Sequence, residues 1–293
     1  MSKTTSAPMS GAKIRKKIGN FFVHVILAVL AFIWLLPIFW VVITSFRKEP
    51  GSYVTTFFPK GYTLDNYKKL FTDTSILNFP QMFLNTFIIA ICTCIISTIF
   101  VLSVSYCMSR MRFKMRKPFM NIAMILGLFP GFMSMVAVYY ILKVFGLTDG
   151  SMIRLSLIIV YSAGTGLGFY VAKGFFDTIP KALDEAALID GATRWQTFTK
   201  VTIPLSKPII VYTILTSFMA PWLDFIFAKV ICRANAQYFT VSIGLWKMLE
   251  KEYINTWYTC FAAGAVVVSV PIAILFIFTQ KFYVDGMSGA VKG

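Results

Sequence analysis

The chain has 293 residues, of which 57% are hydrophobic and only 14% are charged, and its formal net charge is +16. An average soluble domain is about 25% charged and about 45–50% apolar, so this composition excludes a water-soluble globule and predicts an all-α integral membrane protein. Because no soluble basic domain is present to carry the positive charge, the composition also argues against a nucleic-acid partner.

Six long runs without a charged residue predict six transmembrane helices. In chain order they are 18–46, 74–109, 118–142, 155–172, 208–223 and 253–280. A helix needs roughly 20 residues to cross the hydrocarbon layer, and each run is long enough once helix ends are allowed for. The runs are continuously apolar rather than alternating, which excludes a transmembrane barrel.

The Lys and Arg residues between these runs predict that both termini are cytoplasmic. Five of the eight residues at 110–117 are basic, whereas five basic residues are spread over the whole of 47–79. Loops dense in Lys and Arg stay on the cytoplasmic side of a membrane. We therefore expect a cytoplasmic segment over 1–19, a membrane domain over 20–283 and a cytoplasmic tail over 284–293.

Two of the outer loops contain helical patterns. Residues 62–71 have the mixed spacing of a short interfacial helix, and residues 246–253, within the outer loop 229–255, have the pattern of an amphipathic helix. Cys232 and Cys260 flank that loop. A disulfide between them is one alternative, and two buried, unpaired thiols are the favoured one.

The polar stretch 177–207, between the fourth and fifth runs, predicts a cytoplasmic helix–turn–helix. Asp177 or Thr178 can cap a first helix, and Gly191 allows a sharp turn after it. Apolar residues recur every three or four positions, as on one face of a helix, at Leu188, Ala192, Trp195, Phe198 and Val201. An apolar face on so short a helical pair needs a partner, and the four acids in this stretch favour a partner protein over the membrane surface.

This stretch also carries a specific motif. The pattern Glu-Ala-Ala, three residues, Gly, nine residues, apolar-x-apolar-Pro is complete at Glu185, Ala186, Ala187, Gly191, Val201, Ile203 and Pro204. It resembles the coupling loop of permease subunits of binding-protein-dependent ABC importers, with Val201 and Ile203 as mild departures. Further segments, such as NTFIIA at 85–90 and the closing QKFYVDGMSGAVKG, are similar to carbohydrate-importer permeases, above all the second permease of maltose/maltodextrin systems. Arabinogalactan-oligosaccharide permeases share the same segments.

The resemblance implies a multi-pass permease in a bacterial-type cell membrane. Its partners would be a second, homologous permease, two ATPase subunits, an extracytoplasmic solute-binding protein and membrane lipid. The substrate would be an oligosaccharide, with maltose and maltodextrins in first place and arabinogalactan or galacto-oligosaccharides as the alternative. ATP-driven closure of the two ATPases would turn the pore from inward-facing to outward-facing.

The same resemblance implies which residues meet the ATPase. The coupling loop would seat in a cleft of that subunit, and the end of the tail would reach the interface of the ATPase dimer. Glu185 would pair with a basic residue of the cleft, and Gly191 would allow the turn. The full set of expected docking residues is Glu185, Ala186, Ala187, Asp190, Gly191, Arg194 and Pro204.

The sequence contains no motif for a catalytic, cofactor or metal site. It has no G-x-x-x-x-G-K-[ST] loop, so ATP and Mg are expected to be used by the separate ATPase subunit. A membrane-bound enzyme is an alternative that needs a clustered nucleophile or base, and the sole histidine, His24, has no obvious partner. An ion-coupled carrier is a second alternative, which predicts several acids inside the membrane.

Two residues are candidates for the solute pathway. Asp224 is the acid closest to a membrane interior and could accept hydrogen bonds from sugar hydroxyls, while Trp222 could offer a stacking face. The favoured alternative is a structural acid that pairs with Lys229 or a neighbouring chain. The resemblance further implies that the partner permease holds most of the sugar contacts, and that the loop 229–255 meets the solute-binding protein.

Overall fold

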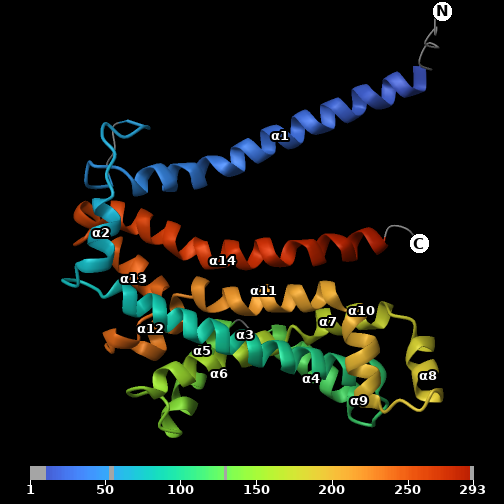
Figure 1. Cartoon of the computed structure of the whole chain (residues 1–293). Helices are drawn as coiled ribbons and strands as arrows, with labels where there is room; N and C mark the ends of the chain where they lie inside the picture. The colour runs from blue at the N-terminus through green and yellow to red at the C-terminus, as the bar shows by residue number, and fades with distance from the viewer. Residues whose placement is uncertain (1–10, 53–55, 129–130, 291–293) are drawn as a thin grey trace, which may run out of the picture.

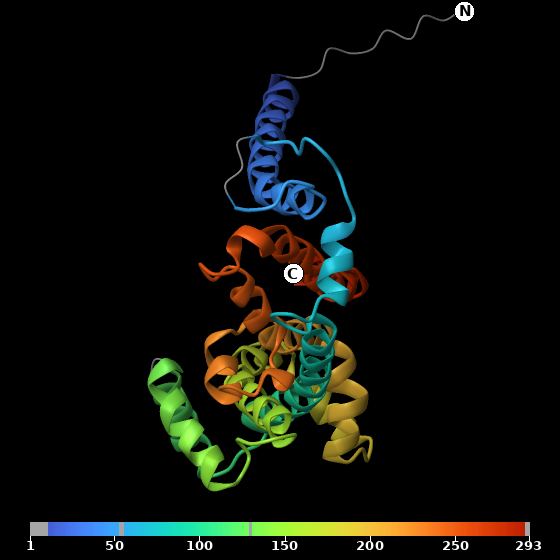
Figure 2. The same cartoon turned by 90° about the vertical axis from the view of Figure 1, so that its left-hand side faces the viewer.

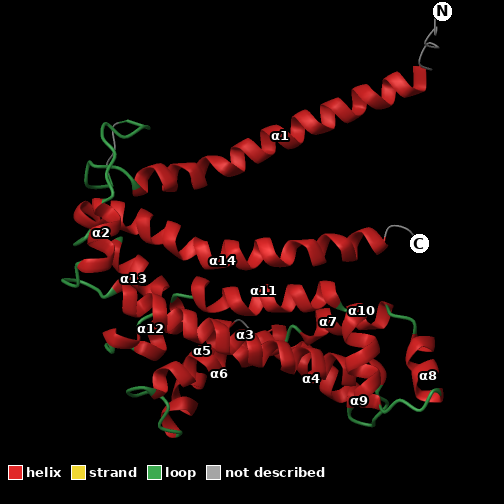
Figure 3. Cartoon of the chain, viewed as in Figure 1, coloured by secondary structure: helices red, strands yellow, loops and turns green. Residues whose placement is uncertain are grey.

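The computed structural model describes residues 11–52, 56–128 and 131–290, and these segments are almost entirely helical (Figure 3). Four long helices run lengthwise and stack in the order α1, α14, α11 and α3 (Figure 1). Their bounds are Gly11–Ser45 for α1, Phe79–Arg110 for α3, Lys207–Leu223 for α11 and Ile254–Ala290 for α14. Long apolar runs take this form because a helix pairs its own backbone groups where water is excluded.

Shorter helices cover the two ends and the remaining side of this stack. The shorter helices before the polar stretch 177–207 are α2 (Asp65–Thr72), α4 (Arg116–Leu128), α5 (Gly131–Val144), α6 (Met152–Gly166) and α7 (Phe169–Thr178). Those between α11 and α14 are α12 (Ile226–Cys232), the 3₁₀ turn η2 (Ala236–Tyr238) and α13 (Val241–Met248). The central helix is α3, which packs against α6, α7, α11 and α13. The helix α14 packs on α11 and α1.

Three helices are long and apolar enough to cross a membrane alone, over Gly19–Ser45, Phe79–Arg110 and Ile254–Phe282. The other three expected spans correspond to bent pairs. The pair α4 and α5 meets at 109° around residues 129–130, which lie outside the described part of the chain, and α6 and α7 meet at 41°. The third pair, Arg194–Leu205 with Lys207–Leu223, is bent by 84°. The described residues therefore contain up to six spans if each bent pair counts as one.

The first long helix stands apart from the rest of the molecule (Figure 2). Every side chain of α1 from residue 19 to residue 39 is exposed, and Trp34 is 77% exposed. The helix packs against α14, and at its end the Ser45 hydroxyl hydrogen-bonds the Tyr67 hydroxyl of α2 at 2.7 Å. Apolar surface of this extent is ordinary where hydrocarbon or another membrane helix, rather than water, covers it.

Several expected boundaries differ from those in the structure. The helix expected at 62–71 is present as α2, but the helix expected at 246–253 was wrongly placed, because α13 ends at Met248 and turns follow. The helix α14 continues through 284–290, part of the expected tail. Residues 1–10 and 291–293, which complete the two expected terminal segments, lie outside the described residues. All five cysteines have free thiols, with Cys232 and Cys260 buried.

Candidate functional site

The polar stretch between α7 and α11 folds as two helical segments joined by a tight turn. The first is α8 (Lys181–Ile189), and the second runs through α9 (Arg194–Thr197), the π-helical stretch Phe198–Thr202 and α10 (Ile203–Leu205). This pair, α8 to α10, lies at the end of the molecule opposite to α2 and α13 (Figure 1). The second segment then turns by 84° into α11.

Local sequence explains the turn. Gly191 has φ +86°, a conformation that glycine adopts without the strain of a Cβ atom. Two residues later, Thr193 and Gln196 form a capping box: the Gln196 amide donates to the Thr193 hydroxyl at 3.2 Å, and the Thr193 amide donates to the Gln196 side-chain oxygen at 2.7 Å. This pattern satisfies two backbone donors at the start of the second segment.

The expectation that Asp177 or Thr178 caps the first segment is wrong. Both residues belong to the last turn of α7, and the residue that precedes α8 is Pro180, which makes no side-chain cap. Asp177 instead accepts a hydrogen bond from the Ser109 hydroxyl at 2.6 Å and forms an ion pair with Lys173.

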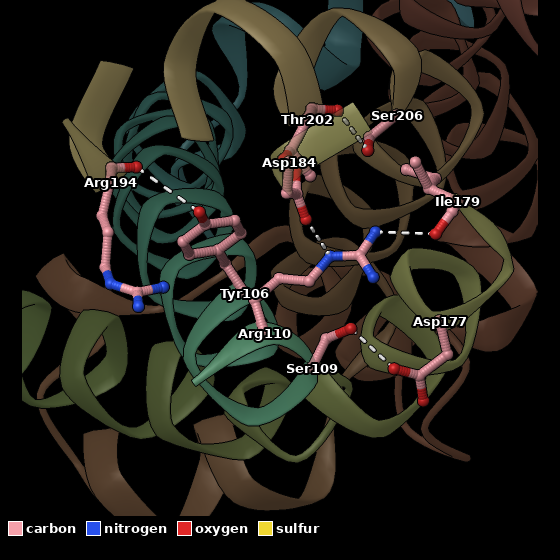
Figure 4. A network of polar contacts seen from close by, with 9 residues as sticks. All are labelled: Tyr106, Ser109, Arg110, Asp177, Ile179, Asp184, Arg194, Thr202 and Ser206. Carbon is pink, nitrogen blue, oxygen red and sulfur yellow. Dashed lines mark hydrogen bonds and ion pairs between the residues drawn. The ribbon is translucent and has the colours of Figure 1, made fainter. Parts of the chain in front are cut away.

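A buried ion pair joins the first segment to the end of α3 (Figure 4). Arg110 Nε lies 2.7 Å from Asp184 Oδ2, and the two side chains are only 4% and 12% exposed. Arg110 also donates from Nη2 to the Ile179 carbonyl at 2.9 Å. Removing one partner of such a pair would leave an uncompensated charge in a poorly hydrated place, so the pair fixes how α8 sits against α3.

The second segment is held by the same group of residues. The Thr202 hydroxyl donates to Asp184 Oδ1 at 3.3 Å, and the Ser206 hydroxyl donates to the Thr202 carbonyl at 2.6 Å. On the other side, the ring of Tyr106 packs 4.7 Å from that of Phe198. Asp184 thus connects α8, α3 and the π-helical stretch, which makes the helical pair one unit with the end of α3.

The docking residues expected from the motif lie on the outside of this unit. Glu185, Ala186, Asp190, Gly191, Arg194 and Pro204 are exposed, and Ala187 is half-buried. A cavity of about 460 Å³ opens beside Glu185 and Arg194, and Arg112, Arg116 and Lys181 also line it. Two acids line this mostly basic cavity: Asp184, which is paired with Arg110, and the exposed Glu185.

Apolar side chains extend the exposed surface of the pair. Ile189 is 85% exposed and Trp195 is 69% exposed. The single apolar face expected from sequence is divided, because Phe198 is buried against Tyr106 while Leu188 and Trp195 face outward. Sequence reasoning missed Ile189, and it missed Arg110 as the partner of Asp184 because those two residues are far apart along the chain.

The acid Asp224 has a structural set of contacts at the end of α11. Its Oδ2 accepts from the Tyr161 hydroxyl at 2.8 Å and from the Ala228 amide at 2.9 Å, so it caps α12. Asp224 does not pair with Lys229, whose ammonium instead lies 4.8 Å from the centre of the Phe239 ring. The acid therefore has internal partners that sequence spacing alone did not identify.

The other pathway candidate, Trp222, is 3% exposed. Its ring packs 5.3 Å from that of Phe83 and 5.9 Å from that of Phe218. In this conformation the indole is buried among the protein's own aromatic side chains. Among the residues that the structure describes, no group of three or more His, Cys, Asp or Glu is placed to hold a metal ion.

Comparisons with known proteins place this geometry in context. Residues 102–287 match the family described as binding-protein-dependent transport system inner membrane component. The galactooligosaccharides transport system permease protein GanQ of Bacillus subtilis is 33% identical over 97% of this chain and 100% of its own length. The maltodextrin transport system permease protein MdxG of the same organism is 29% identical over 96% of this chain and 99% of its own.

A solved structure shares the fold. It belongs to a bacterial ABC transporter involved in the import of the acidic polysaccharide alginate, and it superposes with a TM-score of 0.74 at 22% sequence identity. The match covers 96% of this chain and 100% of that one. At this identity the likeness concerns the fold alone.

Proposed function

The chain belongs to the family of binding-protein-dependent transport system inner membrane components, and we propose that it forms half of the pathway of an ATP-driven oligosaccharide importer. It is a multi-pass inner membrane permease of a sugar ABC importer. The proposed topology has six spans with both termini in the cytoplasm. In this topology α8 to α10 face the cytoplasm, and α2, α12 and α13 face outward.

The proposed substrate is a neutral oligosaccharide, with maltodextrins in first place and galacto-oligosaccharides as the alternative. The similarity to MdxG supports maltodextrins, and the similarity to GanQ supports galacto-oligosaccharides. Of these two relatives, GanQ is the more similar in sequence. Uptake of labelled maltotriose against labelled β-1,4-galactotriose by the reconstituted importer decides between them. Direct contact of Trp222 and Asp224 with the sugar stays a prediction.

The proposed coupling device is the helical pair α8 to α10. Two observations support this role. Glu185 and Ile189 are exposed on one side of the pair, and the buried Arg110–Asp184 ion pair fixes its other side to α3. Such a unit can pass a displacement of a docked subunit to the membrane helices. The proposed partners are two ATPase subunits, a second permease and a solute-binding protein, with ATP and Mg used by the ATPases.

Reconstitution of the complete importer in proteoliposomes tests this function. We expect wild-type uptake to require ATP, and Glu185→Lys to abolish uptake and the ATPase response while the protein remains inserted. Asp149→Lys is the matched control, because Asp149 is an exposed acid in the link between α5 and α6, away from α8 to α10 and outside the loop 229–255, and it should leave uptake unchanged. Uptake that persists in Glu185→Lys at the wild-type rate would refute the docking assignment.

A further inference from the structure

A cavity of about 520 Å³ lies at the end of the molecule opposite to α8. Its walls come from the start of α3, the start of α6, the η2 turn and α13. Two cations line it, Arg154 and Lys247, and no acid is among the described residues that line it. No motif in the sequence pointed to this cavity.

Arg154 is held in place by a buried polar network. Its Nε donates to Asn85 Oδ1 at 3.0 Å, and its guanidinium lies 5.2 Å from the centre of the Tyr238 ring. Asn85 is fully buried, and its amide nitrogen donates to the Gln237 carbonyl at 2.8 Å and the Phe239 carbonyl at 3.1 Å. Because Arg154 donates to Asn85 through Nε, the two Nη groups of Arg154 keep donors for another acceptor.

Lys247 is positioned by neutral groups. Its Nζ donates to the Ile76 carbonyl at 2.7 Å and lies 5.9 Å from the centre of the Tyr253 ring. An ammonium has three donors, and one carbonyl uses only one of them. Two acids lie close in sequence to the lining residues Thr74 and Lys247, but neither lines the cavity. Asp73 accepts a hydrogen bond from the Ser75 amide at 2.9 Å, and Glu250 is exposed.

Two cations facing one cavity repel each other, and an anion between them would remove that repulsion. A carboxylate fits best, because a guanidinium fixed in one plane can donate to both of its oxygens. The proposed topology places the cavity on the outer face, where a solute-binding protein approaches. The two full-length relatives transport galactooligosaccharides and maltodextrins, which carry no charge, so a protein side chain is the better source of the carboxylate.

We propose that this cavity receives an Asp or Glu side chain of the solute-binding protein, bound by Arg154 with Lys247 as the second cation. The proposal rests on the proposed function, because it needs a binding-protein-dependent importer. Arg154 then acts as the specific anchor of the outer face, and the network around Asn85 keeps it ready before the partner arrives. A preformed anchor avoids the cost of ordering a long side chain during association.

The experiment measures ATP hydrolysis by the complete importer in nanodiscs against the concentration of its sugar-loaded solute-binding protein. We expect Arg154→Gln to raise the half-saturating concentration about tenfold, as loss of a charged hydrogen bond would. Lys247→Gln should raise it by a smaller factor, and Arg154→Lys should lose less than Arg154→Gln. Basal hydrolysis without the binding protein and the thermal midpoint of the complex should stay at wild-type values.

Lys143→Gln is the matched control. Lys143 is an exposed cation in the last turn of α5, outside the loop 229–255, and it does not line the cavity. We expect its half-saturating concentration to match wild type. A deca-glutamate peptide should compete with the binding protein for the wild-type importer but not for the Arg154→Gln importer. A deca-glutamine peptide should not compete for either importer. A photo-crosslinker at the exposed Gln237 should capture an acidic segment of the binding protein.

Three results would overturn the proposal. The first is a double variant, Arg154→Gln with Lys247→Gln, whose half-saturating concentration lies within twofold of wild type. The second is an effect seen only with uronate-bearing oligosaccharides, which would make the solute the source of the carboxylate. The third is a wild-type importer that does not respond to the binding protein, which overturns the proposed function as well. A wild type that responds while both cations are dispensable overturns the cavity assignment alone.

Discussion

The two ends of the molecule are built differently. At the end formed by α2 and α13, Leu70, Met248 and Trp257 are buried in one apolar cluster, and the buried Asn85 has its hydrogen bonds satisfied inside the chain. At the end formed by α8 to α10, Ile189 is 85% exposed. The difference teaches that the end formed by α2 and α13 is stable by its own packing, whereas α8 to α10 are held to α3 by the Arg110–Asp184 pair together with the Tyr106–Phe198 contact.

The largest expected effect comes from breaking that ion pair. Asp184→Leu should destabilise the complex by about 3–5 kcal/mol, because it leaves the Arg110 guanidinium buried without a counter-charge. Combining it with Arg110→Met removes both charges and should recover most of the loss. Denaturant unfolding of the purified complex, followed by tryptophan fluorescence, measures both. A double variant as unstable as the single one would show that the pair does not hold this end together.

A smaller effect is expected at the end formed by α2 and α13, where packing rather than charge determines stability. A Cβ atom on Gly244 would lie 2.5 Å from the sulfur of the buried Met82, so Gly244→Ala should cost about 1–3 kcal/mol. Gly174→Ala is the control, since nothing lies within 4 Å of a Cβ placed there. Equal melting temperatures for the two variants would mean that α13 is not packed tightly on α3.

The turn of the helical pair should be sensitive to backbone conformation. Gly191→Ala should cost about 1–2 kcal/mol, because φ +86° strains a residue with a Cβ atom. The surrounding space is open, so bulk is not the cause. Gly191→Asn should cost less, since Asn tolerates positive φ better than other residues. Thermal unfolding of the three proteins compares them, and an Asn variant worse than Ala would contradict this account.

The smallest stability effect is expected on the exposed surface. Ile189→Ser should change stability by no more than about 0.5 kcal/mol, because its side chain contacts little of its own chain. It should nevertheless weaken retention of the ATPase subunits when the complex is diluted in detergent. Ile226→Ser, an exposed isoleucine in α12 at the opposite end, should leave retention at the wild-type level. Retention that is equal in both variants would remove Ile189 from the docking surface.

Sequence patterns predicted the long helices well, because a charge-free run reports burial in hydrocarbon directly. They did not predict the 84° bend before Lys207 or the 41° bend between α6 and α7, since hydropathy carries no information about axis direction. Within the site, the motif located the turn at Gly191, which depends on local conformation. The partners of Asp184 and Asp224 could not be predicted, because Arg110 and Tyr161 reach them only through the tertiary arrangement.

The corner at Ser206 has a mechanical consequence. The twelve residues of Arg194–Leu205 form an arm about 18 Å long that meets α11 nearly at a right angle. A swing of about 10° about that corner would carry the far tip of the arm by about 3 Å. Because the arm stands across α11 rather than in line with it, such a swing twists or tilts the long helix instead of compressing it. With this angle, a sideways displacement of the arm would rotate α11 rather than push it along its axis.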